Sequence, residues 1–324
     1  MNAPVALEQV DLSVRLGGID LAHPLVDASG TFDVLEYARR FDGDYYAGFP
    51  YAAYVPKTVT ADARAGNPAP RVTETPSGMI NAIGLENPGI AAWIDGLSTW
   101  AQLTQPVVVS VGGNSPEQYA AVVRALEEHL ATATGGAGPD IQGYELNVSC
   151  PNISGGVQIG ADPAASAAVV GAVRPLTKRL LLTKLTPNVS DVTEVARAVV
   201  DAGSDGVSLV NTFKAMVIDR ETLKPFLCNR TGGLCGPAIK PIALRMVAEV
   251  AAALPGVPIV GMGGVASGLD ALEFIACGAT AVAVGAANFT AFEAPGRILG
   301  ELRAELAARG LRSPAQARGL ALRA

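Results

Sequence analysis

Eight short apolar runs recur along the 324-residue chain, and each run ends on a small or polar residue. Strands that are apolar throughout and rich in valine are typical of a parallel sheet covered on both faces. Helical patterns lie between most of the runs, so we expect an α/β fold, a (β/α)8 TIM barrel formed by residues 1–324 as one domain. The runs are Leu25–Ser29, Ala53–Lys57, Val107–Ser110, Tyr144–Asn147, Leu181–Lys184, Val207–Asn211, Pro258–Gly263 and Ala281–Gly285.

Three segments between the runs carry clear helix signals. Ser115–Thr134 places its apolar side chains on one face and its charged ones on the other. Ser190 is expected to cap a helix that runs through Val200 and ends at Gly203. Ser267 opens a pattern like a capping box, and Cys277 with Gly278 closes that helix, which predicts a buried, structural Cys277.

Additions to the barrel are expected at both of its ends. Val14–Leu21 is predicted to form an N-terminal hairpin that turns at Gly17 and Gly18. Two segments, Thr60–Pro88 and Phe213–Lys240, are longer than ordinary loops between a strand and a helix. Long insertions of this kind are often lids or substrate-binding loops, and we expect both to lie over the C-terminal face.

Composition excludes several classes of protein. The chain has 24 Lys and Arg against 30 Asp and Glu, and no basic run, so a nucleic-acid partner is not expected. Its longest uncharged stretches contain prolines and glycines, which argues against a membrane span, and no signal peptide is evident. The four cysteines are scattered without a CxxC pair, which predicts no metal site and a cytoplasmic location. His23 and His129 are interpreted as structural.

Polar side chains stand where the predicted strands end. Ser29, Lys57, Asn147, Lys184 and Asn211 are far apart in the sequence, but a barrel brings the carboxyl ends of its strands together. A strand-end lysine is usually a solvated charge. Two lysines that face one barrel mouth would repel each other unless an anion lay between them, and a reduced flavin or an anionic substrate would supply that charge.

Glycines follow the last two predicted strands, at Gly261–Gly264 and Gly285–Asn288. Barrels commonly bind a phosphate group at this position through backbone N–H groups, although glycines can also serve only to make tight turns. A dinucleotide site would need an acidic residue about 20 positions further on, and that region has no carboxylate. The pattern therefore favours a mononucleotide phosphate, and Gly236 could add a third close approach of the backbone.

Four asparagines and one cysteine complete the candidate site. Asn81, Asn147, Asn152 and Asn211 each offer a donor and an acceptor, as a pyrimidine-like ring edge requires, although a single loop asparagine is more often a turn residue. Cys150 follows a predicted strand in which Tyr144, Leu146 and Val148 alternate with polar neighbours. Its thiol has three possible roles, namely general base, covalent nucleophile or inert buried side chain.

Taken together, these motifs resemble the class 1 dihydroorotate dehydrogenases of pyrimidine biosynthesis over nearly the whole chain. The family is a (β/α)8 barrel that holds FMN. The motifs that carry the resemblance are Pro56–Thr60, Asn81–Asn87, Glu145–Asn152, Lys184–Asn188, Val210–Thr212, Gly261–Gly264 and Gly285–Phe289.

The resemblance implies a role for each matching residue. Cys150 would be the base that takes the C5 proton of dihydroorotate while C6 passes a hydride to N5 of FMN. The residues implied to bind the substrate are Lys57, Asn81, Ala82, Ile83, Gly84, Leu85, Asn147, Asn211 and Thr212. The residues implied to bind FMN are Ser29, Lys57, Thr58, Ser110, Asn147, Lys184, Val210, Gly236, Gly263, Gly264, Gly285 and Ala286.

Within class 1, the segment Lys224–Arg245 resembles type B. That type implies a homodimer of FMN subunits that joins two electron-transfer subunits, which carry FAD and a 2Fe-2S cluster and pass electrons to NAD. Three alternatives are a type A homodimer that uses fumarate, a barrel like dihydropyrimidine dehydrogenase, and a catalytically silent flavin-binding scaffold. Ser110, Ala286 and Cys235 depart from the family pattern, which usually has Asn, Thr and Ser at these positions.

Overall fold

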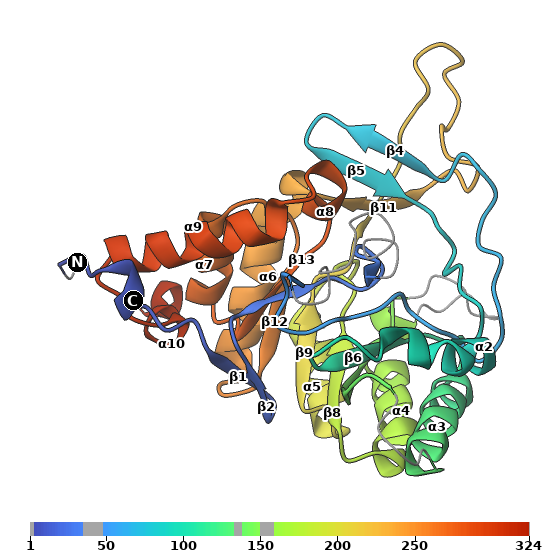
Figure 1. The fold of residues 1–324 in the computed structure, drawn as a ribbon. Coiled ribbons are helices and arrows are strands. Elements are labelled where there is room, and N and C mark those ends of the chain that lie inside the picture. Colours follow the sequence, from blue (N-terminus) through green and yellow to red (C-terminus); the bar gives the residue numbers. More distant parts are fainter. Residues whose placement is uncertain (1–2, 35–47, 133–137, 150–158, 324) are drawn as a thin grey trace.

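The computed structural model describes residues 3–34, 48–132, 138–149 and 159–323. A curled, parallel seven-stranded sheet forms its centre, in the order β3-β13-β12-β9-β8-β7-β6 (Figure 1). Its strands are buried along almost their whole length, as expected for a parallel sheet covered by helices. They are β3 (Leu25–Asp27), β6 (Val107–Val111), β7 (Ile141–Asn147), β8 (Leu180–Lys184), β9 (Gly206–Leu209), β12 (Ile259–Met262) and β13 (Ala281–Val284).

The second predicted strand closes the ring but is not a regular strand. Tyr54 and Val59 form single parallel bridges to Val107 and Val111 of β6, and on the other side the Ala52 N–H donates to the Leu25 carbonyl. Continuous pairing fails because Pro56 has no N–H to donate. The second run, Ala53–Lys57, therefore lies where a barrel requires its remaining strand, and the TIM-barrel prediction holds with this one correction.

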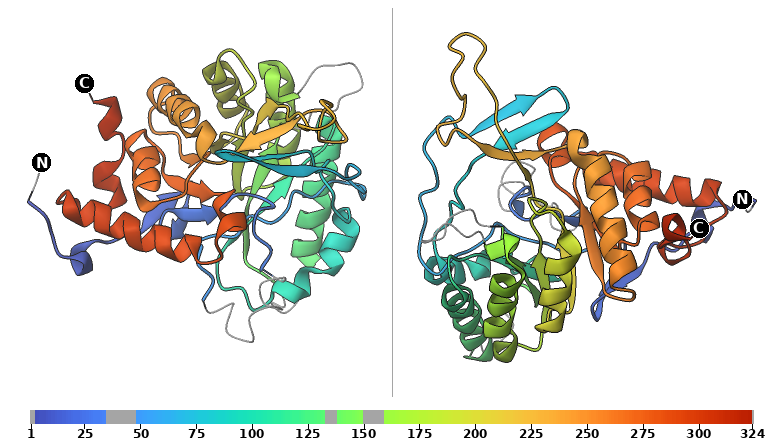
Figure 2. Two further views of the ribbon diagram at one scale, coloured as in Figure 1. Left: turned by 90° about the horizontal axis from the view of Figure 1, so that it is seen from above. Right: turned by 180° about the vertical axis from the view of Figure 1, so that it is seen from behind.

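Helices surround the sheet in all the views of Figures 1 and 2. Most of the predicted helix starts and helix ends are confirmed, including the N-cap at Ser267, whose hydroxyl accepts a hydrogen bond from the Asp270 N–H. The cap predicted at Ser190 is wrong: Asp191 caps that helix by accepting from the Thr193 N–H. The longer helices are α3 (Pro116–Thr132), α4 (Pro163–Val173), α5 (Val192–Asp201), α6 (Lys240–Ala253), α7 (Gly268–Ala276) and α9 (Ala294–Ala308).

Short helical segments complete the described chain. They are η1 (Leu7–Gln9), α2 (Ile90–Asp95), η2 (Leu97–Trp100), η3 (Ile159–Ala161), η4 (Arg174–Leu176), η5 (Pro237–Ile239), α8 (Ala287–Thr290), α10 (Pro314–Ala317) and η6 (Leu320–Leu322). Within the described ranges, no helix is both long enough and apolar enough to cross a bilayer.

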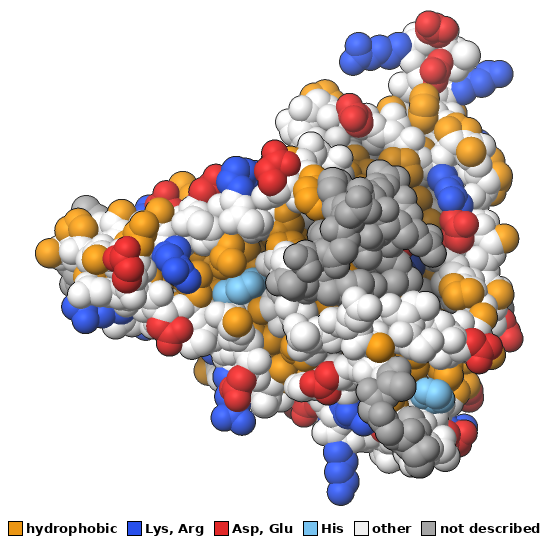
Figure 3. Space-filling model, viewed as in Figure 1, with side chains coloured by type: hydrophobic (Ala, Val, Ile, Leu, Met, Phe, Trp, Pro, Cys, Tyr) orange, Lys and Arg blue, Asp and Glu red, His pale blue; other side chains and the backbone are white. Residues whose placement is uncertain are grey.

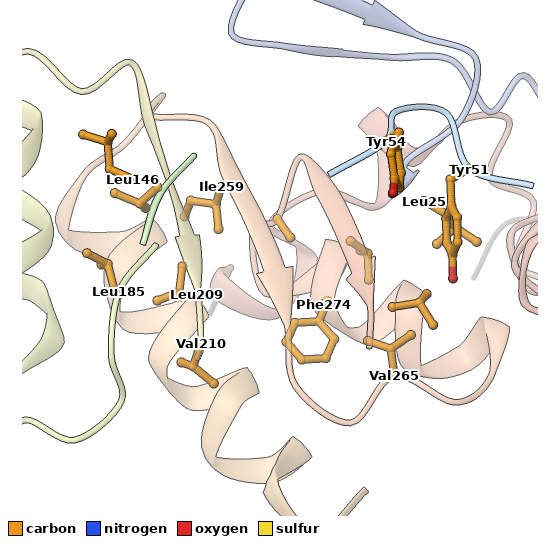
Figure 4. Close-up of a cluster of buried hydrophobic side chains, with 14 of the residues drawn as sticks. Leu25, Tyr51, Tyr54, Leu146, Leu185, Leu209, Val210, Ile259, Val265 and Phe274 are labelled. Carbon is orange, nitrogen blue, oxygen red and sulfur yellow. The ribbon is translucent and has the colours of Figure 1, made fainter. Parts of the chain in front are cut away.

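Two apolar layers hold the barrel together. The outer layer packs the strands against the helices, and Figure 4 shows part of it, with Leu146, Leu209 and Ile259 from the strands and Phe274 from α7. The inner layer fills the lower end of the barrel. There the predicted hairpin, β1 (Val14–Leu16) and β2 (Ile19–Leu21), packs Leu16 against strand side chains such as Leu180 and Leu182.

The two long insertions meet in a second sheet. Strands β4 (Val72–Thr75) and β5 (Gly78–Asn81) come from the first insertion, and β10 (Phe213–Ala215) and β11 (Gly232–Cys235) come from the second. They pair antiparallel in the order β10-β11-β5-β4, and this sheet lies over one end of the barrel (Figure 1). Between β10 and β11 the chain projects from the body, and charged side chains gather at the tip of the projection (Figure 3).

Candidate active site

Lys184 stands at the carboxyl end of β8 and points into the barrel. Alternation along β8 places Leu180 and Leu182 in the inner layer, so Lys184 follows them on the same side. Its side chain is 6% exposed, its Nζ donates to Ser29 Oγ over 3.1 Å, and it lies 3.5 Å from Glu145 Oε1. A buried ammonium group needs such partners, since its desolvation is costly. Lys184 is thus fixed in place, as a cofactor contact would need to be.

A chain of hydrogen bonds joins side chains at the ends of four strands of the barrel, namely the second predicted strand, β6, β7 and β9. Ser110 Oγ and Thr58 Oγ1 lie 2.8 Å apart, and Asn147 Nδ2 donates to Thr58 Oγ1 over 3.2 Å. Asn211 Nδ2 donates to Asn147 Oδ1 over 3.2 Å, and its own Oδ1 accepts from the Thr212 N–H. Asn147 and Asn211 were predicted at the mouth of the barrel because they end strands, and the family resemblance implied Thr58, Ser110 and Thr212. The fold brings all five into one network.

Lys57 faces the same end of the barrel. Its side chain passes over Gly30, where an added Cβ would lie 2.5 Å from Lys57 Cδ. Burial lowers the pKa of Lys57, and the charge of Lys184 lowers it further. Arg71, which pairs with Glu86 at 2.5 Å, adds a third positive charge in this region. Glu86 offsets part of this positive charge, and an anion bound between Lys57 and Lys184 would relieve the repulsion that remains.

Residues 81–85 connect the second sheet to the barrel. Asn81 ends β5, and its Nδ2 lies 3.5 Å from the Gly233 carbonyl of β11. Gly84 and Leu85 have positive φ values of 79° and 54°, which turn the chain back towards the barrel. Leu85 then reaches the barrel beside Gly112, where an added Cβ would lie 3.5 Å from Leu85 Cδ1. The segment Asn81–Leu85 also contains Ala82 and Ile83, and both carbonyls accept hydrogen bonds from Asn67.

The predicted phosphate-binding glycines form a tight backbone cradle. Gly263 and Gly264 have φ values of 127° and 86°, which residues with a side chain rarely adopt. A Cβ added to Gly264 would lie 2.7 Å from the Gly236 carbonyl oxygen, and Gly236 itself has a φ of 97°. Val210 borders the cradle, since its N–H donates to the Met262 carbonyl just before Gly263.

Gly285 and Ala286 follow β13, the strand beside β12, and therefore lie at the same end of the sheet as this cradle. A Cβ on Gly285 would meet Ala28 at an ordinary 3.5 Å, so close packing does not require glycine at this position. Ala286 stands immediately before α8. Their predicted contact with a phosphate group stays a prediction.

Several predicted residues lie apart from this network. Cys150 and Asn152 fall outside the residues that the structure describes. His23 is half-buried, and its Nδ1 accepts from the Leu25 N–H, which suits the structural role predicted for it. Cys277 is only half-buried, because it is the C-cap residue of α7, so the prediction that it is buried was too strong. Burial raises the pKa of the half-buried Cys235 to about 11.

Sequence reasoning missed three charged residues that shape the site. Asp27 and Glu145 lie inside the barrel with exposures of 1% and 3%, and Arg71 lies near Lys57. A signal for the first two was present, since each interrupts an apolar run in a strand that is buried on both faces. Arg71 stands in a long loop, where no sequence pattern indicated that it would lie near the site. In the described ranges, no cluster of His, Cys, Asp and Glu could hold a metal ion.

Comparisons with known proteins agree on one family. A profile described as "Dihydroorotate dehydrogenase" matches residues 11–306. The chain is 47% identical over 281 residues to the "Dihydroorotate dehydrogenase B (NAD(+)), catalytic subunit" of Pelobacter propionicus, covering 86% of this chain and 88% of that protein. It is 43% identical over 307 residues to the protein of the same name from Geobacter sulfurreducens, covering 94% and 96% of the two chains.

Proposed function

Because the chain belongs to the dihydroorotate dehydrogenase family, we propose that it is the catalytic subunit of a type B enzyme and oxidises dihydroorotate to orotate. The observation that carries the proposal is that the buried Lys184 and the hydrogen-bonded chain of Thr58, Asn147 and Asn211 lie together at the carboxyl ends of the strands. Chemistry in TIM barrels takes place at this end.

The backbone cradle fits the phosphate of FMN. Gly236, Gly263 and Gly264 approach one another so closely that a Cβ on Gly264 would need the Gly236 carbonyl to move. Such an arrangement lets backbone N–H groups reach an anionic phosphate directly. Together with Gly285, Ala286 and Val210, these residues would hold the phosphate and ribityl chain. When bound, FMN supplies the acceptor for the hydride that leaves C6 of dihydroorotate.

The lysines would stabilise negative charge. Lys184 is held between Ser29 and Glu145, which fixes its ammonium group at the barrel mouth, where it would contact a bound flavin. Lys57 carries a pKa lowered by burial and by Lys184, so an anion bound beside it would relieve the repulsion and favour its charged form. The carboxylate of dihydroorotate is such an anion.

The amide network would orient the pyrimidine ring. Each asparagine amide has two N–H donors and an oxygen with two lone pairs. Asn147 uses one donor on Thr58 and one lone pair on Asn211, and Asn211 uses one of each on Asn147 and Thr212. Among the described residues, each side chain therefore keeps one donor and one lone pair that a ligand could use, in an orientation that the network already fixes.

Cys150 is proposed as the base that removes the C5 proton. It follows Asn147 by three positions in the sequence, just beyond the end of β7. A cysteine thiolate is a stronger base than a carboxylate, because the ordinary pKa of the thiol is about 8.5, and it is formed closer to neutral pH than a neutral lysine amine is. Ser29, Thr58 and Ser110 would complete the flavin contacts, and Asn81–Leu85 with Thr212 would complete the substrate contacts.

The relatives' name, a catalytic subunit that uses NAD, supports a partner protein. We propose an electron-transfer subunit with FAD and a 2Fe-2S cluster, joined to a homodimer of this chain in the cytoplasm. The chain should therefore co-purify with a second, coloured chain from its native cells. Alone, it should form orotate with an artificial electron acceptor but not with NAD.

Substrate competition tests the assignment. Dihydroorotate should support turnover, and dihydrouracil, which lacks the carboxylate that Lys57 would bind, should support little. Preference for dihydrouracil would point to a barrel like dihydropyrimidine dehydrogenase. Turnover by the chain alone with fumarate would point to a type A enzyme, and binding of FMN without any turnover would point to a silent scaffold.

A further inference from the structure

A second ionisable cluster lies inside the barrel, beneath Lys184. Asp27 at the end of β3 and Glu145 in the middle of β7 are 1% and 3% exposed, and Lys184 is 5% exposed. The walls around the two carboxylates are apolar and include Leu16, Val26, Val108 and Met262. Two carboxylates and one ammonium group in such surroundings would carry a net negative charge, which is costly far from water.

Each carboxylate has one satisfied and one unsatisfied oxygen. Asp27 Oδ1 accepts from the Val55 N–H over 2.7 Å, and Glu145 Oε2 accepts from Ser208 Oγ over 2.7 Å. Asp27 Oδ2 and Glu145 Oε1 are buried, and neither has a hydrogen-bond partner among the described residues. Both residues line one cavity of about 10 Å³, which is close to the space that a single water molecule needs.

The charges that face the pair are few. Along the described chain, Glu145 and Lys184 are the charged side chains that act on Asp27, and Lys184 is the cation paired with Glu145. Burial raises the pKa of the Asp27 carboxyl well above its ordinary value, and the charge of Glu145 raises it further, against the lowering effects of the Val55 N–H and Lys184. Two carboxylates that share a site titrate as a pair, and one of them keeps its proton.

We propose that Asp27 and Glu145 form a buried proton-binding site that holds one proton, carried by Asp27, so that Lys184 is balanced by a single carboxylate. The Asp27 hydroxyl then donates towards Glu145 Oε1, directly or through one water molecule in the cavity. This interaction gives a hydrogen bond to Asp27 Oδ2 and Glu145 Oε1, which otherwise have none among the described residues. A bare metal ion fits less well, because hard cations bind about six oxygen ligands and this cavity is largely apolar.

The site would set the charge beneath the flavin. This consequence depends on the proposed function, but the shared proton does not. With Asp27 neutral, the cluster of Asp27, Glu145 and Lys184 has no net charge, and Lys184 keeps its ammonium group available to the cofactor. An ionised Asp27 would leave one excess negative charge there and disfavour reduction of a bound flavin. Asp27 and Glu145 are thus positioning residues that act through Lys184.

Infrared spectroscopy of the purified protein at neutral pH tests the proposal without any substrate. The wild-type protein should show the C=O stretch of a protonated carboxylic acid. Labelling aspartate with ¹³C at the carboxyl carbon should shift this band, and labelling glutamate should not. This measurement needs no variant. Absence of an aspartic acid band from the wild-type protein would overturn the proposal.

Variants then test whether the proton is shared. Asp27→Asn should lose the band, because this variant lacks the acid that carries the proton. Glu145→Gln should lose it as well, because Asp27 becomes the counterion of Lys184. The control Asp20→Asn, at an exposed position of β2, should keep the band unchanged. Persistence of the band in Glu145→Gln would show that Asp27 holds its proton independently and would refute sharing.

Thermal stability gives a second readout. Each single variant leaves Lys184 with one carboxylate, whereas the double variant Asp27→Asn/Glu145→Gln leaves it with none. The double variant should therefore lower the Tm by more than the sum of the two single effects. Additive changes in Tm would contradict a shared proton. Failure to oxidise dihydroorotate would count against the proposed function and would leave both of these measurements valid.

Discussion

Substituting Gly264 by alanine should weaken FMN binding through the backbone cradle. Gly264 has a φ of 86°, and an alanine Cβ would lie 2.7 Å from the Gly236 carbonyl oxygen and 2.9 Å from Lys240 Cβ. The backbone oxygen cannot rotate away, so the loop before η5 and the turn after β12 must separate by several tenths of an ångström. Gly236 on one side of the cradle, and Gly263 with Gly264 on the other, would then lie too far apart to bind one phosphate together.

The size of the effect follows from two contributions. Left-handed backbone costs alanine about 1–2 kcal/mol in stability. Loss of one hydrogen bond to a charged phosphate costs about 1.5–3 kcal/mol of binding free energy, which corresponds to roughly 10- to 150-fold weaker binding. We therefore expect Gly264→Ala to fold with reduced stability and to bind FMN at least tenfold more weakly.

Gly256→Ala is the matched control. Gly256 has a φ of 87°, nearly that of Gly264, but an added Cβ would meet nothing within 4 Å. It should show the backbone strain in denaturant unfolding and bind FMN as the wild-type protein does. The assay is titration of the apoprotein with FMN, followed by quenching of flavin fluorescence. Equal FMN affinities for the two variants would refute the assignment of this cradle to the phosphate.

Three further predictions concern stability. Leu16→Ala should cost about 2–5 kcal/mol in denaturant unfolding, because Leu16 is 3% exposed and seals the lower end of the barrel; a smaller loss would argue against that role. Burial lowers the pKa of His23 to about 4, so between pH 6.5 and 4 the unfolded chain binds a proton that the folded chain does not bind. The free energy of unfolding should therefore fall by on the order of 2–3 kcal/mol over this range. The variant His23→Asn should not show this fall. Burial and Lys184 lower the pKa of Lys57, so Lys57→Met should stabilise the apoprotein near neutral pH, by an amount that shrinks as pH rises towards 10.5; a constant difference would contradict a depressed pKa.

Much of the barrel could be predicted from the apolar runs, because a buried parallel strand can be recognised in the sequence by its apolar composition and its length. The exception, around Tyr54 and Val59, has a local cause in Pro56, which interrupts the ladder. The sheet formed by both insertions could not be predicted. Periodicity identifies strands such as β5 and β11 but not their partners, and these two pair across about 150 intervening positions.

The candidate site likewise contains some residues that could be predicted from the sequence and others that could not. Residues at strand ends, such as Lys184, Asn147 and Asn211, were predictable because the topology gathers strand ends. Asp27 and Glu145 were not recognised, since a polar residue within an alternating run is read as facing solvent, whereas in a closed barrel that side is the interior. The role of Cys150 depended on resemblance, and it stays a prediction.

The most direct test of the proposed activity is anaerobic reduction of the protein-bound flavin by dihydroorotate, followed in a stopped-flow spectrometer. The purified chain should be yellow, and dihydroorotate should bleach it within a single turnover. Cys150→Ala should bind FMN normally but be bleached about 10²-fold more slowly, the usual effect of losing a general base. A protein that binds FMN but is not bleached by dihydroorotate, or a Cys150→Ala variant that is bleached at the wild-type rate, would contradict the account.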